Sequence, residues 1–313
     1  MLPWRKAIRE ALYGVDGFYR RNRPAGHFHT SARSPVFAEA ILRVVKELDA
    51  ALGHPAEFDL VDVGAGEGEL LTGVLELADD GLAARLRPVG VELRHRPVGL
   101  DARIGWRDVP PSRVTGLITA CEWLDNVPLD VVVRTETGVR LERVDAHGVT
   151  EPGEPVADPW LDAWWPDGER AEIGRPRDLA WATLVSTVER GAALAVDYGH
   201  LKAARPAHGT LTGFAHGRQV PPVPDGSRDI TAHVAMDAVA AAGVRAGATA
   251  TSLATQREAL RGLGFSTERP PLALASADPG GYLRGLSRTG EVAELTDPAG
   301  LGAHWWLLQR VSC

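Results

Sequence analysis

A glycine-rich segment between residues 58 and 75 constrains the fold of this chain more than any other feature. It begins with a short apolar run, FDLVDV (58–63), which is typical of a buried strand in a parallel sheet. Three glycines follow closely, and a helical stripe comes next, made of Leu70, Leu71, Val74 and Leu75. A tight glycine turn between a strand and a helix predicts the ligand-binding unit of an open α/β sheet.

The spacing of Gly64, Gly66 and Gly68 indicates which ligand the loop binds. A dinucleotide-binding loop has its third glycine three residues after the second, and Glu69 occupies that position here. The carboxylate of Asp62 suits a positively charged amino group better than a pyrophosphate. The N–H groups at the start of the following helix suit an anionic group such as a carboxylate. We therefore expect Asp62 and the three glycines to bind S-adenosyl-L-methionine (SAM), and a NAD-dependent dehydrogenase fits less well.

Three further apolar runs predict neighbouring strands, at residues 88–93, 115–120 and 191–198. Strands that alternate with helical segments favour a parallel α/β sheet. Glu92 ends the first of these runs, where a carboxylate can accept hydrogen bonds from both ribose hydroxyls. Asp108 follows the run IGWR, and we expect it near the adenine amine of the same cofactor.

Two of the predicted strands end in acidic sequences, CEWLD (121–125) and DYG (197–199). Ligands of open α/β sheets bind beyond the carboxyl ends of the strands, so Glu122, Asp125 and Asp197 should meet at one cleft. Carboxylates can clamp a guanidinium through two parallel hydrogen bonds. The pattern predicts catalytic residues for arginine methylation, and helix capping is the alternative role for these acids.

The chain divides into four expected regions. Residues 1–57 form an N-terminal helical cover, and residues 58–126 form the SAM-binding half of a Rossmann-like domain. Residues 127–188 form an inserted substrate-binding region. Residues 189–313 complete the Rossmann-like domain and contain an irregular substrate loop at 200–228.

Several elements are predicted within these regions. Trp4, Ile8 and Leu12 share one stripe of a first helix, and Ser34 with Pro35 marks the start of another. Residues 129–144 read as a hairpin with its turn near Thr137-Gly138. A helix is expected from Asp229 or Thr231 to about Ala242, and HWWLLQRV (304–311) predicts a closing strand.

The composition excludes several classes of protein. The net charge is −7, whereas a general nucleic-acid binder usually has a basic domain. No apolar run approaches the roughly 18–20 residues of a membrane span. The N-terminal MLPWRKAIREAL lacks the apolar block of a signal peptide. Two cysteines make neither a disulfide framework nor a zinc set, so we expect a cytoplasmic protein without nucleic-acid or membrane partners.

Three histidines, His27, His29 and His216, raise the question of a metal site. Metal ligands need a defined geometry, and the spacing of these residues does not specify one. We expect structural or ligand-facing histidines here, and no metal.

Separated strings along the chain, taken together, resemble those of one known family. They are GFY (17–19), HFHTSARSPVFAEAI (27–41), VDVGAGEGEL (61–70), CEWLDNVPL (121–129), PDGERAEI (166–173), VDYGH (196–200), GTLTGFAHGR (209–218), SRDITAHV (227–234) and TQREALRGLGF (255–265). In this order they resemble the MidA-like methyltransferases, which include mitochondrial protein arginine methyltransferases that assist respiratory complex I assembly.

The resemblance implies a class I SAM-dependent methyltransferase sheet and roles for particular residues. It implies that SAM is bound by Asp62, Gly64, Gly66 and Glu92. The HFHTS segment would close over the cofactor, with Thr30 and Ser31 nearby. Glu122 and Asp125 match the acidic positions of the family's Asn-Glu-Phe-Phe-Asp motif. The residues in later motifs are Asp197 and three for which we expect substrate binding: Asp229, Thr231 and His233.

The chain departs from this family pattern in the segment that follows the third strand. Cys121 stands in place of asparagine, Trp123-Leu124 in place of two phenylalanines, and Asn126-Val127 in place of Ala-Leu. These changes fall where the methyl acceptor is expected to lie.

Three hypotheses follow for the function. The chain methylates a protein arginine, or it methylates a small molecule or peptide natural product, or it is a non-catalytic assembly protein that keeps the fold. The intact Gly64, Gly66 and Gly68 disfavour the third. The expected partner is a protein or small-molecule methyl acceptor, and a homodimer stays open.

Overall fold

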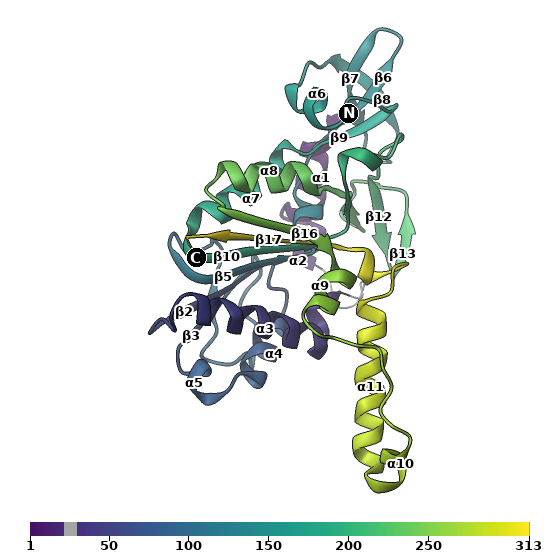
Figure 1. The fold of residues 1–313 in the computed structure, drawn as a ribbon. Helices are drawn as coiled ribbons and strands as arrows, with labels where there is room; N and C mark the ends of the chain where they lie inside the picture. Colours follow the sequence, from purple (N-terminus) through teal and green to yellow (C-terminus); the bar gives the residue numbers. More distant parts are fainter. Residues whose placement is uncertain (22–29, 313) are drawn as a thin grey trace.

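A seven-stranded central sheet organises the computed structural model, which describes residues 1–21 and 30–312 (Figure 1). The strand order is β16-β17-β10-β5-β2-β3-β4. The strands that run parallel to one another are β2 (Phe58–Val63), β3 (Leu86–Val91), β4 (Gly105–Arg107), β5 (Val114–Cys121) and β10 (Val188–Asp197). Antiparallel to its neighbours, β17 (Trp305–Val311) lies between β10 and β16 (Ala250–Thr255). The predicted Rossmann-like sheet and its closing strand are confirmed.

Helices cover both faces of this sheet, as Figure 1 shows. On one face lie α3 (Pro35–Ala51), α4 (Glu69–Leu77) and the short α5 (Asp80–Ala83). On the other lie α7 (Arg175–Thr187) and α8 (Met236–Arg245). The start of α3 is as predicted, because the Ser34 hydroxyl accepts the Val36 N–H at 3.2 Å and Pro35 opens the first turn.

A second, smaller sheet lies beside the central one. Its strands are β1 (Leu2–Pro3), β6 (Asp130–Thr135), β7 (Gly138–Val144), β8 (Thr150–Pro155) and β9 (Arg170–Ile173). The helix α6 (Pro159–Trp164) comes between β8 and β9 in the chain and packs against this sheet. The predicted hairpin is confirmed by the β6–β7 pair. The N-terminal α1 (Trp4–Tyr13) packs here through its predicted stripe, and Trp4 Nε1 donates to Glu142 at 2.6 Å. The short α2 (Phe18–Arg21) follows α1.

The irregular stretch expected at 200–228 is interrupted by short strands, and further short strands follow up to residue 235. They are β11 (Gly199–His200), β12 (Thr212–Ala215), β13 (Arg218–Val220), β14 (Asp229–Thr231) and β15 (Val234–Ala235). The helix expected from Asp229 or Thr231 was wrong in its start, because these residues pair with β12 and the helix begins at Met236. Their polar side chains bond to partners across the chain instead of capping α8, whose N-cap is Ala235.

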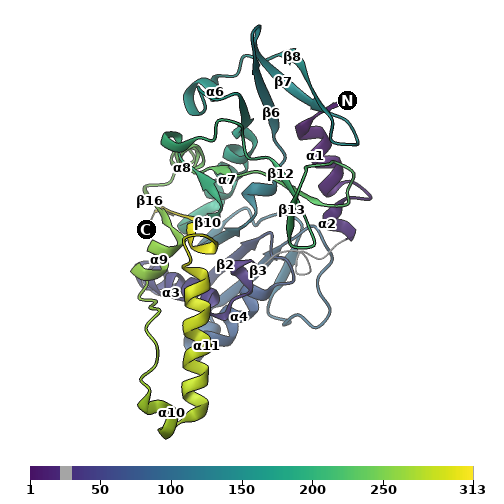
Figure 2. The ribbon, with the colours of Figure 1, turned by 90° about the vertical axis from the view of Figure 1, so that its right-hand side faces the viewer.

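The C-terminal part adds a protruding arm. After α9 (Gln256–Gly262), the helices α10 (Ala273–Ala277) and α11 (Pro279–Leu295) extend away from the sheet (Figures 1 and 2). Within the described ranges, no helix is long and apolar enough to span a membrane.

Candidate active site

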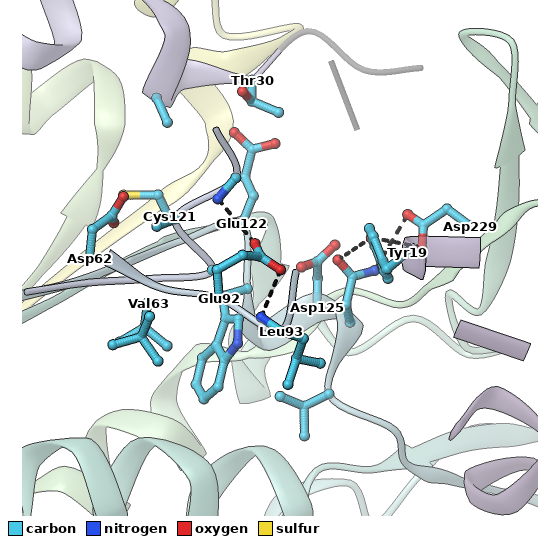
Figure 3. A pocket seen from close by; sticks show the side chains of 18 of the residues that line it. Tyr19, Thr30, Asp62, Val63, Glu92, Leu93, Cys121, Glu122, Asp125 and Asp229 are labelled. Atoms are coloured by element: carbon cyan, nitrogen blue, oxygen red, sulfur yellow. Dashed lines mark hydrogen bonds between the residues drawn. The ribbon is translucent and has the colours of Figure 1, made fainter. Parts of the chain in front are cut away.

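A cavity of about 1030 Å³ opens beyond the carboxyl ends of β2, β3 and β5. Ten of the predicted site residues line it: Thr30, Asp62, Gly64, Gly66, Glu92, Asp108, Glu122, Asp125, Asp229 and His233. Figure 3 shows Asp62 on one side, Tyr19 and Asp229 on the other, and Glu92, Glu122 and Asp125 between them. Four predicted residues do not line the cavity: Ser31, Gly68, Asp197 and Thr231.

The glycine loop has a backbone that only glycine adopts without strain. Gly64, Gly66 and Gly68 have φ angles of 77°, 60° and 82°, all in the left-handed region. A Cβ on Gly64 would lie 3.0 Å from Trp123 Cδ1, and one on Gly68 would lie 2.8 Å from Leu100 Cδ1. Gly68 is the N-cap of α4, so it shapes the loop from behind the cavity wall. The sequence therefore forms a tight backbone cradle at the start of α4.

Glu92 connects this loop to the end of β3. Its Oε2 accepts the Gly66 N–H at 3.1 Å, and its Oε1 accepts the N–H groups of Leu93 and Arg94 at 2.9 and 3.2 Å. The Arg94 guanidinium lies 3.6 Å away. These contacts hold a carboxylate at the cavity wall, where the sequence predicts recognition of ribose.

Asp62 is the second carboxylate at the end of the cavity formed by the glycine loop and Glu92, which we call the donor end because the methyl donor is expected there. Its Oδ1 accepts the Thr119 hydroxyl at 2.7 Å. Burial raises the pKa of Asp62 to about 7, so its charge depends on pH near neutrality. The glycine cradle, one carboxylate for an ammonium group and another for hydroxyls together fit SAM. Asp108 is exposed at the rim of the same end.

Glu122 follows β5 with a φ angle of 50°, which is uncommon for a residue with a side chain. Its Oε1 accepts the Ser31 N–H at 3.0 Å. Ser31 is itself buried and directs its hydroxyl to Gln256 Oε1 at 3.2 Å, so only its backbone serves the site. Burial raises the pKa of Glu122 to about 8. His27 and His29 of the predicted covering segment lie outside the described residues.

Asp125 lies on the short helix η3 (Leu124–Asn126) and is almost fully buried. Its Oδ2 accepts the hydroxyls of Tyr198 and Thr231, the latter at 2.7 Å. Its buried Oδ1 has no hydrogen-bond partner among the described residues. Burial raises the pKa of Asp125, and the bonds from Tyr198 and Thr231 oppose that rise. Thr231 thus orients a cavity residue without lining the cavity.

Two buried residues behind η3 set its position. Asp197 is fully buried, and its Oδ2 accepts the N–H groups of Leu124 and Asp125 at 3.0 and 3.2 Å. Arg177 donates to the carbonyls of Ala232 and His233 at 2.9 Å each and also to that of Asp125. Asp197 therefore acts through the turn, whereas Glu122 and Asp125 face the cavity.

The far end of the cavity contains side chains that sequence reasoning assigned no role. Tyr19, Tyr198, His304 and Asn126 line it together with the predicted Asp229 and His233. Burial, with the nearby charge of Asp125, raises the pKa of Asp229 to about 7. Burial lowers the pKa of His304 to about 4. Tyr19 and Tyr198 stand in quoted motifs, GFY and DYG, but His304 carries no sequence signal.

The fold and this site define a class I SAM-dependent methyltransferase. Residues 36–254 match the model of the Methyltransf_28 family, described as an S-adenosyl-L-methionine-dependent methyltransferase. The chain belongs to this family, and the resemblance to MidA-like methyltransferases is confirmed. SAM is accordingly its methyl donor.

Two solved structures are similar over the whole chain. One is a COG1565 superfamily member from Burkholderia thailandensis bound to S-adenosyl-homocysteine, with 27% identity and a TM-score of 0.81. The other is a native structure of a COG1565 superfamily protein from Burkholderia thailandensis, with 26% identity and a TM-score of 0.80. Each alignment covers 99% of this chain and 87% of the other. No curated protein matches the chain.

Proposed function

We propose that this methyltransferase transfers the methyl group of SAM to a guanidinium nitrogen of an arginine in a protein. The observation that carries the proposal is the set of carboxylates in the cavity wall beyond the glycine loop: Glu122, Asp125 and Asp229. A guanidinium is permanently charged, has five N–H donors and is planar. It is therefore the methyl-accepting group that best satisfies several carboxylates at once.

The residues of the chain would act by binding and orientation. When bound, SAM supplies an electrophilic methyl group on its sulfonium sulfur. Asp125 lines the cavity, where its carboxylate attracts a cationic acceptor. Glu122 Oε1 already accepts the Ser31 N–H, which leaves Oε2 for the acceptor. Held between them, the guanidinium presents one nitrogen to the methyl carbon, and such positioning supplies much of the acceleration.

Glu122 is also the proposed proton acceptor. As the new N–C bond forms and the C–S bond breaks, the methylated nitrogen must lose one proton. The ionised form of Glu122, which a bound guanidinium favours, accepts that proton, and a pKa raised to about 8 makes it a stronger base than an ordinary carboxylate. We place the reaction in the cytoplasm, because a free thiol at the cavity wall, Cys121, suits a reducing compartment.

The test uses SAM with a labelled methyl group and a lysate or arginine-rich peptides as acceptors. Acid-stable methylarginine in protein is the expected product, and it should be lost in Glu122→Gln and Asp125→Asn. The control is Glu57→Gln, an exposed glutamate that pairs with Arg87 near the opposite end of β2. Label found only in small molecules would contradict the protein acceptor and favour the natural-product hypothesis.

A further inference from the structure

Three side chains from distant segments form a hydrogen-bonded ring in the wall of the cavity. Tyr19 belongs to α2, Asn126 to η3 and Asp229 to β14. The Tyr19 hydroxyl lies 2.8 Å from Asn126 Oδ1 and 3.0 Å from Asp229 Oδ1, so these two oxygens share its single proton. Asn126 Nδ2 lies 3.1 Å from the same Asp229 oxygen. Figure 3 shows Tyr19 beside Asp229 at the end of the cavity away from Asp62.

The ring leaves one carboxylate oxygen less engaged than the other. Asp229 Oδ1 is within reach of both Tyr19 and Asn126, whereas Oδ2 has only a long contact of 3.4 Å with Asn126 Nδ2. A carboxylate oxygen can accept more than one hydrogen bond. Asp229 Oδ2 is therefore available to an N–H donor of a ligand, while Oδ1 fixes the orientation of the group.

Asn126 is the member on which the ring depends, because it both accepts and donates. Its amide oxygen faces Tyr19 and its amide nitrogen faces Asp229. The bonds from Tyr19 and Asn126 lower the pKa of Asp229 against the rise that burial and the charge of Asp125 cause. Burial and the charge of Asp229 raise the pKa of Tyr19 well above its usual value, so Tyr19 stays a donor. The ring thus favours the ionised form of Asp229.

We propose that Asn126 is a specificity-determining residue of the acceptor site. Asn126 orients the carboxylate of Asp229 so that this carboxylate can bind a cationic acceptor. The identification of that cation as arginine rests on the proposed function. Asp229 supplements Glu122 and Asp125 and comes from a different element. The ring therefore governs how tightly a charged acceptor is bound, and it leaves the donor end unchanged.

The experiment measures kcat and KM for an arginine-containing peptide with SAM, in the wild type, Asn126→Ala and Tyr19→Phe. Loss of one hydrogen bond to a charged group corresponds to about tenfold to hundredfold in affinity. We expect KM for the peptide to rise in this range in Asn126→Ala and less in Tyr19→Phe. The kcat and the Kd of S-adenosylhomocysteine should stay unchanged.

The matched control is Tyr13→Phe, which removes a hydroxyl that donates to the backbone carbonyl of Asn126 at 3.1 Å and to no side chain of the ring. An additional readout is the pH dependence of KM. Asn126→Ala removes a bond that lowers the pKa of Asp229, so the fall in KM with rising pH should move to higher pH. The groups that face Asp229 are the carboxylate of Asp125 and the uncharged hydroxyls of Tyr13 and Tyr19.

The outcomes separate this inference from the proposed function. An unchanged KM in Asn126→Ala, with arginine methylation by the wild type intact, overturns the inference alone. If the Kd of S-adenosylhomocysteine rises by the same factor as KM, Asn126 has a general structural role, and the inference is overturned as well. Absence of arginine methylation by the wild type overturns the proposed function and this inference with it. Should Asn126→Ala fail to fold, Tyr19→Phe tests the ring from its other side.

Discussion

Replacing Glu92 by alanine tests the donor end of the cavity. The carboxylate accepts three backbone N–H groups, from Gly66, Leu93 and Arg94, at 2.9 to 3.2 Å. Each bond to a charged acceptor contributes about 1.5–3 kcal/mol in a buried setting, and water at the cavity will replace part of it. We expect the free energy of unfolding to fall by about 1–3 kcal/mol. Loss of two bonds to ribose hydroxyls should weaken SAM binding by about hundredfold or more.

The assay is calorimetric titration with SAM and with S-adenosylhomocysteine, accompanied by thermal unfolding. Glu57→Ala is the control, because Glu57 is an exposed partner of Arg87 and lies away from the cavity. Wild-type affinity in a folded Glu92→Ala variant would refute the assignment of Glu92 to the donor. An equal loss in Glu57→Ala would show that the effect is not local.

Three more predictions concern other parts of the site. Arg177→Met should lower the free energy of unfolding by about 3 kcal/mol or more, because four backbone carbonyls lose their donor. Urea denaturation measures this change, and an unchanged midpoint would count against the role of Arg177 in holding the turn. SAM affinity should fall as pH drops below about 7, because Asp62, whose pKa burial raises to about 7, becomes neutral there; calorimetry at pH 6 and 8 should show this in the wild type and not in Asp62→Asn. Gly68→Ala should lower the free energy of unfolding by about 1–2 kcal/mol, because the φ of 82° is strained for alanine, and the clash of the new Cβ with Leu100 adds to this. A thermal midpoint equal to that of the wild type would disprove the strain.

The donor end could be predicted from the sequence because its signals are local. The strand, the glycines and the following helix are contiguous, and each has a pattern that few other structures share. Glu92 is predicted from its place at the end of the next apolar run, and the structure places it against Gly66. The sequence does not predict how Gly68 and Ser31 act. Gly68 caps α4 behind the cavity wall, and Ser31 contributes its backbone N–H to Glu122.

The acceptor end could not be predicted in the same way, because its residues meet only through tertiary packing. Asp229 and Thr231 resemble the start of a helix, yet they pair with β12 and aim at η3. Arg177 lies on a helix whose sequence suggests no special role, and His304 precedes an ordinary closing strand. No local pattern predicts the hydrogen bond between Tyr19 and Asp229, because these residues are 210 positions apart.

The residues that depart from the family motif at 121–127 therefore lie at different ends of the cavity. Trp123 packs against the glycine loop, where a Cβ on Gly64 would touch it, and Cys121 is close enough to Asp62 for that charge to help raise its thiol pKa. These two changes border the donor end, although the sequence suggested an acceptor role for the whole segment. Asn126 faces the other way, toward Tyr19 and Asp229. Asn126 therefore contacts a cavity carboxylate, Asp229, without contributing to the glycine cradle.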